Sequence, residues 1–481
     1  MRRGHLVGAA VAACSVLVAG ACSTTVQGDA VSVFDDPFSV AGMPATDGPT
    51  GFRPNAAAPT REVEGTDGGS IDELAAGATS DIEEYWATTF PETFDEDFTP
   101  AADLFSWDSD GFDGEFCGED TYGLVNAGFC YDDRTIGWDR GQLLPGLKRA
   151  HGEMGVVMVL AHEYGHAVAR QAGLSAEDTP TLLSEQQADC FAGAYMRWVA
   201  EDNSPRFTVS TGEGLNNVLA GVISFRDPLL TENDPDAGYD EHGSAFERLS
   251  AFQFGFTDGP SACAAIDMRE IAQRRGDLPV LLPEDQTGEL PVTEESVQSI
   301  VEAMEILFEP ADPPALSFDA AEAESCADAR PSPPASFCPS TNTIVLDMPG
   351  MEDMGARTDP DEGGTLATGD NAAYSVLVSR YMVAIQHEHG GVSLDNAAAA
   401  LRTACLTGVA TVKMSQDVTT PGGDTIALTA GDVDEAVSGM LTNGLAASDV
   451  NGETVPSGFS RIDAFRLGVL GDAERCFKRF P

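Results

Sequence analysis

The most informative segment of this 481-residue chain reads Gly155-Val156-Val157-Met158-Val159-Leu160-Ala161-His162-Glu163-Tyr164-Gly165-His166. A run of apolar and small residues leads directly into two histidines, which is typical of a buried helix. Because four residues make roughly one helical turn, His162 and His166 are expected on the same helix face, where both can bind one metal ion. Glu163 would then lie beside the open coordination position and could take a proton from an attacking water.

A second predicted helix supplies a third ligand. Thr179 before Pro180 is a typical helix start, and the helix continues as Leu182-Leu183-Ser184-Glu185-Gln186-Gln187-Ala188-Asp189-Cys190-Phe191-Ala192-Gly193. Glu185 and Asp189 are one turn apart. Glu185 would complete a site of two histidines and one glutamate for zinc, and Asp189 would accept the second ring N–H of a ligand histidine. The simpler alternative makes the histidines ordinary core residues, but it leaves the second motif without a role.

These two segments resemble the neutral zinc metallopeptidase family of bacteria, which is marked by A-H-E-[YF]-G-H followed by E-x-Q-A-D-C-[FY]-A-G. Residues 161–166 and 185–193 match these motifs. The resemblance implies an α+β, zincin-like domain that binds one Zn²⁺ per chain and hydrolyses peptide bonds, with Glu163 as the base. Residues 167–169 depart from the family pattern, which leaves the ligands intact but puts substrate contacts in doubt. A three-histidine site is excluded, because Ala169 and Ala172 stand where it needs Gly and His.

His242 lies in a later segment, His242-Gly243-Ser244 to Arg248, that also resembles the family. Two interpretations of His242 stay open. It is either a catalytic donor that stabilises the oxyanion of the transition state, or a histidine that orders the loop beside Ser244 at the start of a helix. Arg248 is expected to be a structural ion-pair partner.

The second half of the chain repeats the pattern of the first. Residues 130–139 are echoed by residues 338–347, and Arg248 to Cys263 is echoed by Arg461 to Cys476. This register puts non-ligand residues at the positions of His162, Glu163, His166 and Glu185, namely Ser379, Arg380, Val383 and Ala400. We therefore expect a degenerate copy that binds no metal. The nearby segment His387-Glu388-His389 lacks the required spacing and is expected to be an exposed helix end.

The fold class expected from these patterns is α+β, with a zincin-like domain followed by a degenerate repeat of it. The predicted organisation is a signal peptide at residues 1–21, a lipidated Cys22 with a flexible tether to residue 70, a metallopeptidase domain at residues 71–275 and the metal-free repeat at residues 276–481. The segment between Asp347 and Asn371 is a candidate lid or partner loop, or else a plain surface loop.

The N-terminus predicts export. Arg2 and Arg3 precede an apolar stretch that is too short for a membrane span and ends in Ala21-Cys22, which resembles a lipoprotein cleavage site. The protein is then expected on the outer face of the bacterial cytoplasmic membrane, attached only by lipid on Cys22. Plain secretion with cleavage nearby is the alternative.

The cysteines support an oxidising compartment. Without Cys14 and Cys22, eight of the ten remain, and four fall at matched places in each copy. The pairs predicted from this match are Cys117–Cys130, Cys190–Cys263, Cys326–Cys338 and Cys405–Cys476. A rival role for Cys190 as a zinc ligand is disfavoured because Cys405 persists in the copy that lacks the ligands.

The formal net charge is −52, which disfavours binding to nucleic acid and to anionic lipid headgroups. The expected partner is a protein or peptide substrate. The alternative from another functional class is a non-catalytic binding or assembly factor of the cell envelope, which uses the second copy as its recognition surface.

Overall fold

The fold is known from a computed structural model that describes residues 36–176, 178–234, 242–284, 287–357 and 366–481. These residues belong to one compact unit, Val33–Pro481, of mixed helices and short strands, so the predicted α+β class is confirmed. The predicted signal peptide and Cys22 lie outside the described residues. Among the helices of the described part, none combines the length and the apolar character that a membrane span needs.

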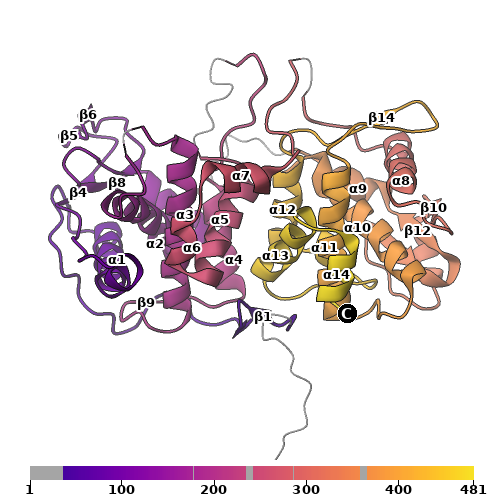
Figure 1. Ribbon diagram of the computed structural model, residues 1–481, viewed down its shortest axis with the longest axis horizontal. Coiled ribbons are helices and arrows are strands. Elements are labelled where there is room, and N and C mark those ends of the chain that lie inside the picture. The colour runs from indigo at the N-terminus through magenta and orange to yellow at the C-terminus, as the bar shows by residue number, and fades with distance from the viewer. Residues whose placement is uncertain (1–35, 177, 235–241, 285–286, 358–365) are drawn as a thin grey trace, which may run out of the picture. The chain divides into compact units, whose positions relative to one another are not determined.

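The first half consists of one three-stranded sheet, three two-stranded sheets and a group of helices (Figure 1). The three-stranded sheet has the order β4-β8-β7, in which β4 is parallel and β7 antiparallel to β8. The main elements of the first half are α1 (Ser70–Phe94), β4 (Leu104–Trp107), β7 (Ala127–Phe129), β8 (Ile136–Asp139), α2 (Leu143–Gln171), α3 (Thr181–Ala200), α4 (Glu213–Ile223), α5 (Ala245–Asp258), α6 (Pro260–Ala264) and α7 (Met268–Arg275).

The second half repeats this order of elements. Its sheet has the order β10-β12-β11, again with one parallel and one antiparallel neighbour of the central strand. The elements are α8 (Glu294–Phe308), β10 (Ala315–Ser317), β11 (Ala335–Cys338), β12 (Thr343–Leu346), α9 (Met348–Met354), α10 (Asp370–His389), α11 (Ala397–Lys413), α12 (Asp432–Thr442), α13 (Gly458–Val469) and α14 (Ala473–Arg479). Helix contacts are repeated too, because α2, α3, α4 and α5 pack as α10, α11, α12 and α13 do.

Glycines allow the closest helix contacts in both halves. A Cβ on Gly193 of α3 would overlap the carbonyl oxygen of Phe252 in α5, and a Cβ on Gly408 of α11 would overlap that of Phe465 in α13. Gly255 and Gly468 face Cys190 and Cys405 in the same reciprocal way. Each pair of helices therefore crosses with backbone against backbone, and that approach requires glycine at these four positions.

All four predicted disulfides are present, and they occupy matched places in the two halves. They are Cys117–Cys130, Cys190–Cys263, Cys326–Cys338 and Cys405–Cys476. Because Cys190 is bonded to Cys263, its rival role as a zinc ligand is wrong.

The two halves meet through equivalent helices, α4 and α5 of the first and α12 and α13 of the second. The backbone N–H of Phe246 in α5 donates to Asp434 Oδ1 in α12 at 3.3 Å, and the N–H of Gly458 in α13 donates to Asn216 Oδ1 in α4 at 2.7 Å. The contact of α5 with α12 thus mirrors the contact of α13 with α4. Such reciprocity is what an interface around an approximate twofold axis requires.

The tether prediction is wrong for residues 36–69. Gly51–Phe52 (β3) pairs with Phe207–Thr208 (β9), and Phe52 stacks on Phe207 with ring centroids 4.7 Å apart. Val40 is fully buried, so this segment is part of the folded body. The proline and glycine content that predicted a flexible chain instead supports turns between short strands, including the pair Ser39–Val40 (β1) and Met43–Pro44 (β2).

The remaining short elements lie in connections between the main helices and strands. They are β5 (Glu115–Phe116), β6 (Glu119–Asp120), η2 (Ala320–Ser325), η3 (Pro339–Thr341), β13 (Val418–Thr419), β14 (Thr425–Ile426) and η4 (Leu445–Ala447). The described part of the candidate lid contains α9, whose Met351 is fully buried, while residues 358–365 lie outside the description. His387 to His389 form the exposed end of α10, as predicted.

Candidate metal centre

Two buried helices position the predicted ligands. The first helix, α2, bends at Gly152, where φ is 74°, and its second part carries His162 and His166. The next helix, α3, begins at Thr181, one residue later than predicted, because Pro180 keeps an extended backbone with ψ 133°. Gly165 faces the backbone of Ala188, and a Cβ there would lie 2.8 Å from two of its atoms. This close approach brings the faces of α2 and α3 that carry the ligands together.

The side chains of His162, His166 and Glu185 converge. Nε2 of His162 lies 3.0 Å from Oε2 of Glu185, and Nε2 of His166 lies 3.2 Å from Oε1. A tetrahedral zinc ion separates its ligand atoms by roughly 3.3 Å, given bonds of about 2.0 to 2.1 Å. The three residues are 6%, 7% and 9% exposed, so the site is largely shielded from bulk solvent.

Asp189 fixes the orientation of His162. Its Oδ1 lies 2.8 Å from His162 Nδ1, the position expected for an acceptor of the second ring N–H. Arg248 donates to both oxygens of Asp189, through Nε at 2.8 Å and Nη2 at 2.7 Å, and is the structural ion-pair partner that the sequence predicted. The Asp189 carboxylate is fully buried, and its charge is balanced by Arg248. Burial alone would raise the pKa of Asp189, but Arg248 and His162 have the larger effect and lower it.

The donor set fits a metal ion because two lone pairs face each other. A carboxylate can only accept, so Nδ1 of His162 carries the proton that points at Asp189. Nε2 of the neutral ring then presents a lone pair to a Glu185 oxygen only 3.0 Å away. Either a second proton or a cation must lie between them. Burial lowers the pKa of His162, but Asp189 and Glu185 raise it to about 10, so a proton serves this purpose when no metal is bound.

His166 and Glu163 complete this side of the site. Nδ1 of His166 lies 3.2 Å from Ser184 Oγ, which leaves Nε2 free to face Glu185. Glu163 forms no hydrogen bond or ion pair with any residue that the structure describes, and burial raises its pKa. A carboxylate without a protein partner and with a raised pKa is suited to accept a proton from a small molecule at the site.

His242 lies at the rim of the site. Its backbone N–H and that of Gly243 donate to the carboxylate of Asp227, at 3.0 and 2.7 Å, and its Nδ1 lies 3.3 Å from Asp227 Oδ1. Nε2 faces Glu185 at 4.0 Å, and the hydrogen bond to Asp227 raises the pKa of His242. The contacts with Asp227 bear out the interpretation that His242 orders the segment before Ser244, while its catalytic role stays a prediction.

The equivalent positions in the second half contain no metal-ligand cluster. Ser379 donates to Val376 O of its own helix at 2.6 Å, and Val383 and Ala400 are buried apolar residues. Arg380 is fully buried and donates to the carbonyl oxygens of Asp449 and Leu445, at 2.8 and 2.6 Å. At the position that corresponds to Glu163, the second half thus has an arginine that links α10 to backbone carbonyls of another segment.

Three residues near the centre were not singled out from the sequence. Ser184 contacts His166, Asp227 holds His242, and Tyr131 O–H lies 3.3 Å from Ser184 Oγ. Ser184 is adjacent to a ligand, and that adjacency was the available signal. Tyr131 and Asp227 reach the site through loops whose path no helical or strand period predicts.

Comparisons with family models, with curated proteins and with solved structures give no match for this chain.

Proposed function

We propose that this protein is a zinc-dependent endopeptidase, with His162, His166 and Glu185 as the zinc ligands and Glu163 as the general base. The observation that carries the proposal is the convergence of His162 Nε2 and His166 Nε2 on the two oxygens of Glu185, at 3.0 and 3.2 Å, because one cation bound between these atoms would satisfy all of them. A set of two nitrogens and one oxygen is typical of catalytic zinc sites. When bound, zinc supplies a Lewis acid that polarises a substrate carbonyl and increases the acidity of water.

The protein's own groups would then perform the proton transfers. Glu163 takes a proton from the attacking water and passes it to the leaving amine. The hydrogen bond to Asp227 raises the pKa of His242, and in its protonated form His242 donates a hydrogen bond from Nε2 to the oxygen of the scissile carbonyl. Asp189 and Arg248 keep His162 in the tautomer whose Nε2 lone pair points into the site.

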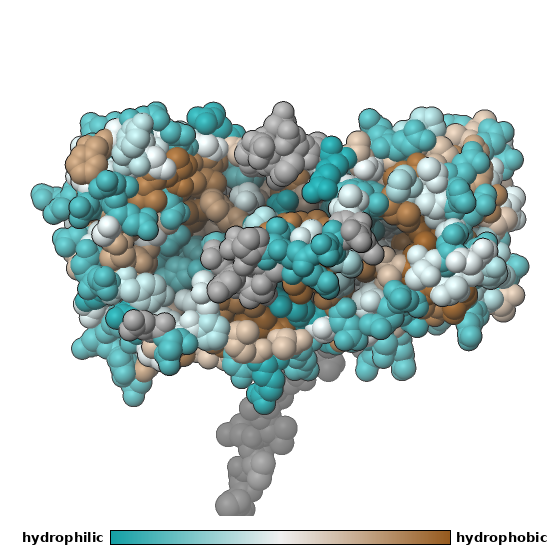
Figure 2. Space-filling model, turned by 90° about the horizontal axis from the view of Figure 1, so that it is seen from above, coloured by the Kyte–Doolittle hydropathy of each residue, from teal (hydrophilic) through white to brown (hydrophobic). Residues whose placement is uncertain are grey.

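A pocket is lined by residues of both halves, among them Asp227 and Ser244 of the first and Ala430 and Asp434 of the second. Asp227, which also accepts hydrogen bonds from the backbone of His242, connects this pocket to the rim of the candidate centre. Figure 2 shows apolar side chains between the hydrophilic ones on the face seen from above. We propose that the second half is a degenerate copy of the first that forms part of the substrate groove. The repeated order of elements, disulfides and glycine contacts supports a duplication.

The proposed location is the outer face of the bacterial cytoplasmic membrane, with a lipid on Cys22. The four disulfides support an oxidising compartment. Radiolabelled palmitate should enter the wild-type protein in cells and should not enter a Cys22→Ala variant. Labelling of both proteins would contradict this assignment.

The decisive activity test uses the purified, zinc-loaded chain and a labelled, unfolded protein as substrate. Cleavage should be lost in Glu163→Gln while the zinc content stays at one per chain. Glu73→Gln, which changes an exposed glutamate of α1, is the control and should cleave normally. If the native chain binds zinc but cleaves neither this substrate nor a peptide library, the envelope binding factor is the better account.

A further inference from the structure

A second cluster of possible metal ligands lies in the second half, at the N-termini of α10 and α12. Oxygen atoms of Glu289, Asp370 and Glu435 all lie within 4.8 Å of one another. Asp432, in the first turn of α12, is buried and close enough to raise the pKa of Glu435 by repulsion. Four carboxylates therefore share one region in which all but Glu289 are more than nine-tenths buried.

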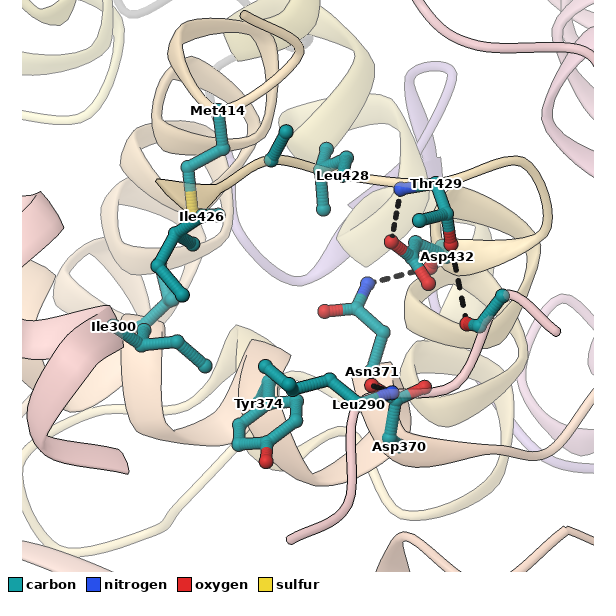
Figure 3. A pocket seen from close by; sticks show the side chains of 13 residues that line it. Leu290, Ile300, Asp370, Asn371, Tyr374, Met414, Ile426, Leu428, Thr429 and Asp432 are labelled. Carbon is teal, nitrogen blue, oxygen red and sulfur yellow. Dashed lines mark hydrogen bonds between the residues drawn. The ribbon is translucent and has the colours of Figure 1, made fainter. Parts of the chain in front are cut away.

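The Asp370 carboxylate has an unsatisfied oxygen. Asp370 is 6% exposed, and its Oδ1 is buried without a hydrogen-bond partner among the described residues. The other oxygen, Oδ2, accepts the backbone N–H of Leu290 at 2.8 Å. Figure 3 shows Asp370 and Asp432 on the wall of a neighbouring pocket, with the dashed bonds that engage them. A buried carboxylate oxygen without a donor is costly unless a cation binds it.

Local positive charge is too small to balance the cluster. The backbone N–H groups of Asp370 and Asn371 donate to Glu289 Oε2 at 3.2 Å and to Glu435 Oε2 at 2.8 Å. Arg357 lies 3.3 Å from Glu289 Oε1 and is itself half exposed. Burial and the neighbouring carboxylates raise the pKa of Asp370 to about 7 and that of Glu435 to about 9, so without a cation the cluster binds protons at neutral pH, and a bound cation would displace them.

We propose that Glu289, Asp370 and Glu435 form a calcium site. All the ligand atoms are carboxylate oxygens, which hard cations prefer, whereas zinc prefers nitrogen and sulfur. Ca²⁺ accepts six to eight oxygens in an irregular arrangement, while Mg²⁺ demands a near-ideal octahedron and keeps several waters. A cage supplied mainly by buried protein carboxylates therefore fits Ca²⁺, with water as the remaining ligands.

A calcium ion at this site would stabilise the N-terminal turn of α12, which is the part of α12 that contacts the first half. Asp434, one residue before Glu435, accepts the N–H of Phe246 at 3.3 Å and lies 3.8 Å from Arg226. Phe246 is in the first turn of α5, which directly follows the loop that carries His242. Calcium would thus stabilise the contact between the halves beside the candidate centre, whether or not that centre is catalytic.

The test is a calcium titration of the full chain, purified in calcium-free buffer and saturated with zinc so that the nitrogen-rich centre is occupied. Calorimetry should detect one Ca²⁺ per chain with a Kd of roughly 10⁻⁶ to 10⁻³ M, and Tm should rise with calcium. The double variant Asp370→Asn/Glu435→Gln should lose this binding and the rise in Tm. Without calcium and at a pH above 9, where the native carboxylates are ionised, the double variant should melt above the native chain, because the repulsion is removed.

The control is Asp328→Asn/Glu453→Gln, which removes the same charge from two exposed sites and should bind Ca²⁺ like the native chain. Glu289→Gln changes the least buried ligand and gives a second reading if the double variant does not fold, with an expected loss of affinity of at least tenfold. No binding to the native chain at 10 mM CaCl₂ would overturn the proposal. Equal binding by the native chain and by Glu289→Gln would overturn it as well.

Discussion

The corresponding helix pairs of the two halves, α2 with α3 and α10 with α11, carry different residues at matched positions. In the first half, α2 and α3 bring two imidazoles and a carboxylate together in a nearly dry site. In the second half, α10 and α11 bury Val383 and Ala400 at the same places, and Arg380 donates to backbone carbonyls of a loop. The helix pair therefore packs in the same way without the three ligand residues. The disulfides and the glycine contacts are present in both halves and are the features that the two packings share.

The largest expected contrast is between Glu163→Gln and Arg380→Gln, which change equivalent positions. Glu163→Gln should lower kcat/KM by about 10²- to 10⁴-fold, because a positioned base is lost, and should leave stability nearly unchanged. Arg380→Gln should leave kcat/KM nearly unchanged and reduce the free energy of unfolding by about 2 to 4 kcal/mol, since buried carbonyls lose their donors. Peptide kinetics and urea denaturation measure the two effects.

A large loss of activity in Arg380→Gln at a temperature where the variant is fully folded would break this contrast. That result would mean that Arg380 in the second half contributes to the catalytic step and not only to stability.

The long disulfides give the next contrast. Cys190–Cys263 and Cys405–Cys476 close loops of 73 and 71 residues. Loop-closure entropy assigns each about 4 kcal/mol, so replacing either pair by alanines should cost nearly the same free energy of unfolding. Only loss of the first pair should also weaken zinc binding, because Cys190 is on the helix that carries Glu185. Calorimetric unfolding and zinc titration decide this, and equal zinc affinity in both variants would contradict it.

The smallest expected effect concerns the matched glycines. Gly193→Ala and Gly408→Ala should each reduce stability by about 1 to 3 kcal/mol, because a methyl group would force α3 from α5 or α11 from α13. Activity should fall only in Gly193→Ala, whose displaced helix carries Glu185 and Asp189. Thermal unfolding and kcat/KM provide the two readings. A similar loss of activity in both variants would show that the two helix pairs are coupled more tightly than their packing indicates.

The sequence predicted those features that depend on local spacing. Four-residue spacing placed His162 with His166 and Glu185 with Asp189, and the matched cysteines gave all four disulfides. The α+β class was implied by the resemblance of the two motifs to a known family. The spacing and the disulfide predictions succeeded because each rests on a period of a helix or on a repeat that the chain itself contains.

Other features depend on long-range contacts and could not be predicted. Residues 36–69 look flexible by composition, yet β3 pairs with β9, which is more than 150 residues away. The convergence of Glu289, Asp370 and Glu435 joins a loop to the starts of two helices, and no spacing indicates it. Asp227 likewise contacts His242, which is 15 residues later in the chain, and no spacing indicates this contact.

The central claim is that one half holds the metal and the other does not. Anomalous X-ray diffraction at the zinc edge from crystals of the zinc-loaded chain tests this claim most directly. One strong peak should lie within roughly 2.0 to 2.2 Å of His162 Nε2, His166 Nε2 and a Glu185 oxygen, with none beside Ser379, Val383 and Ala400. A peak in the second half, or a Glu185 carboxylate turned away from the metal, would contradict the account.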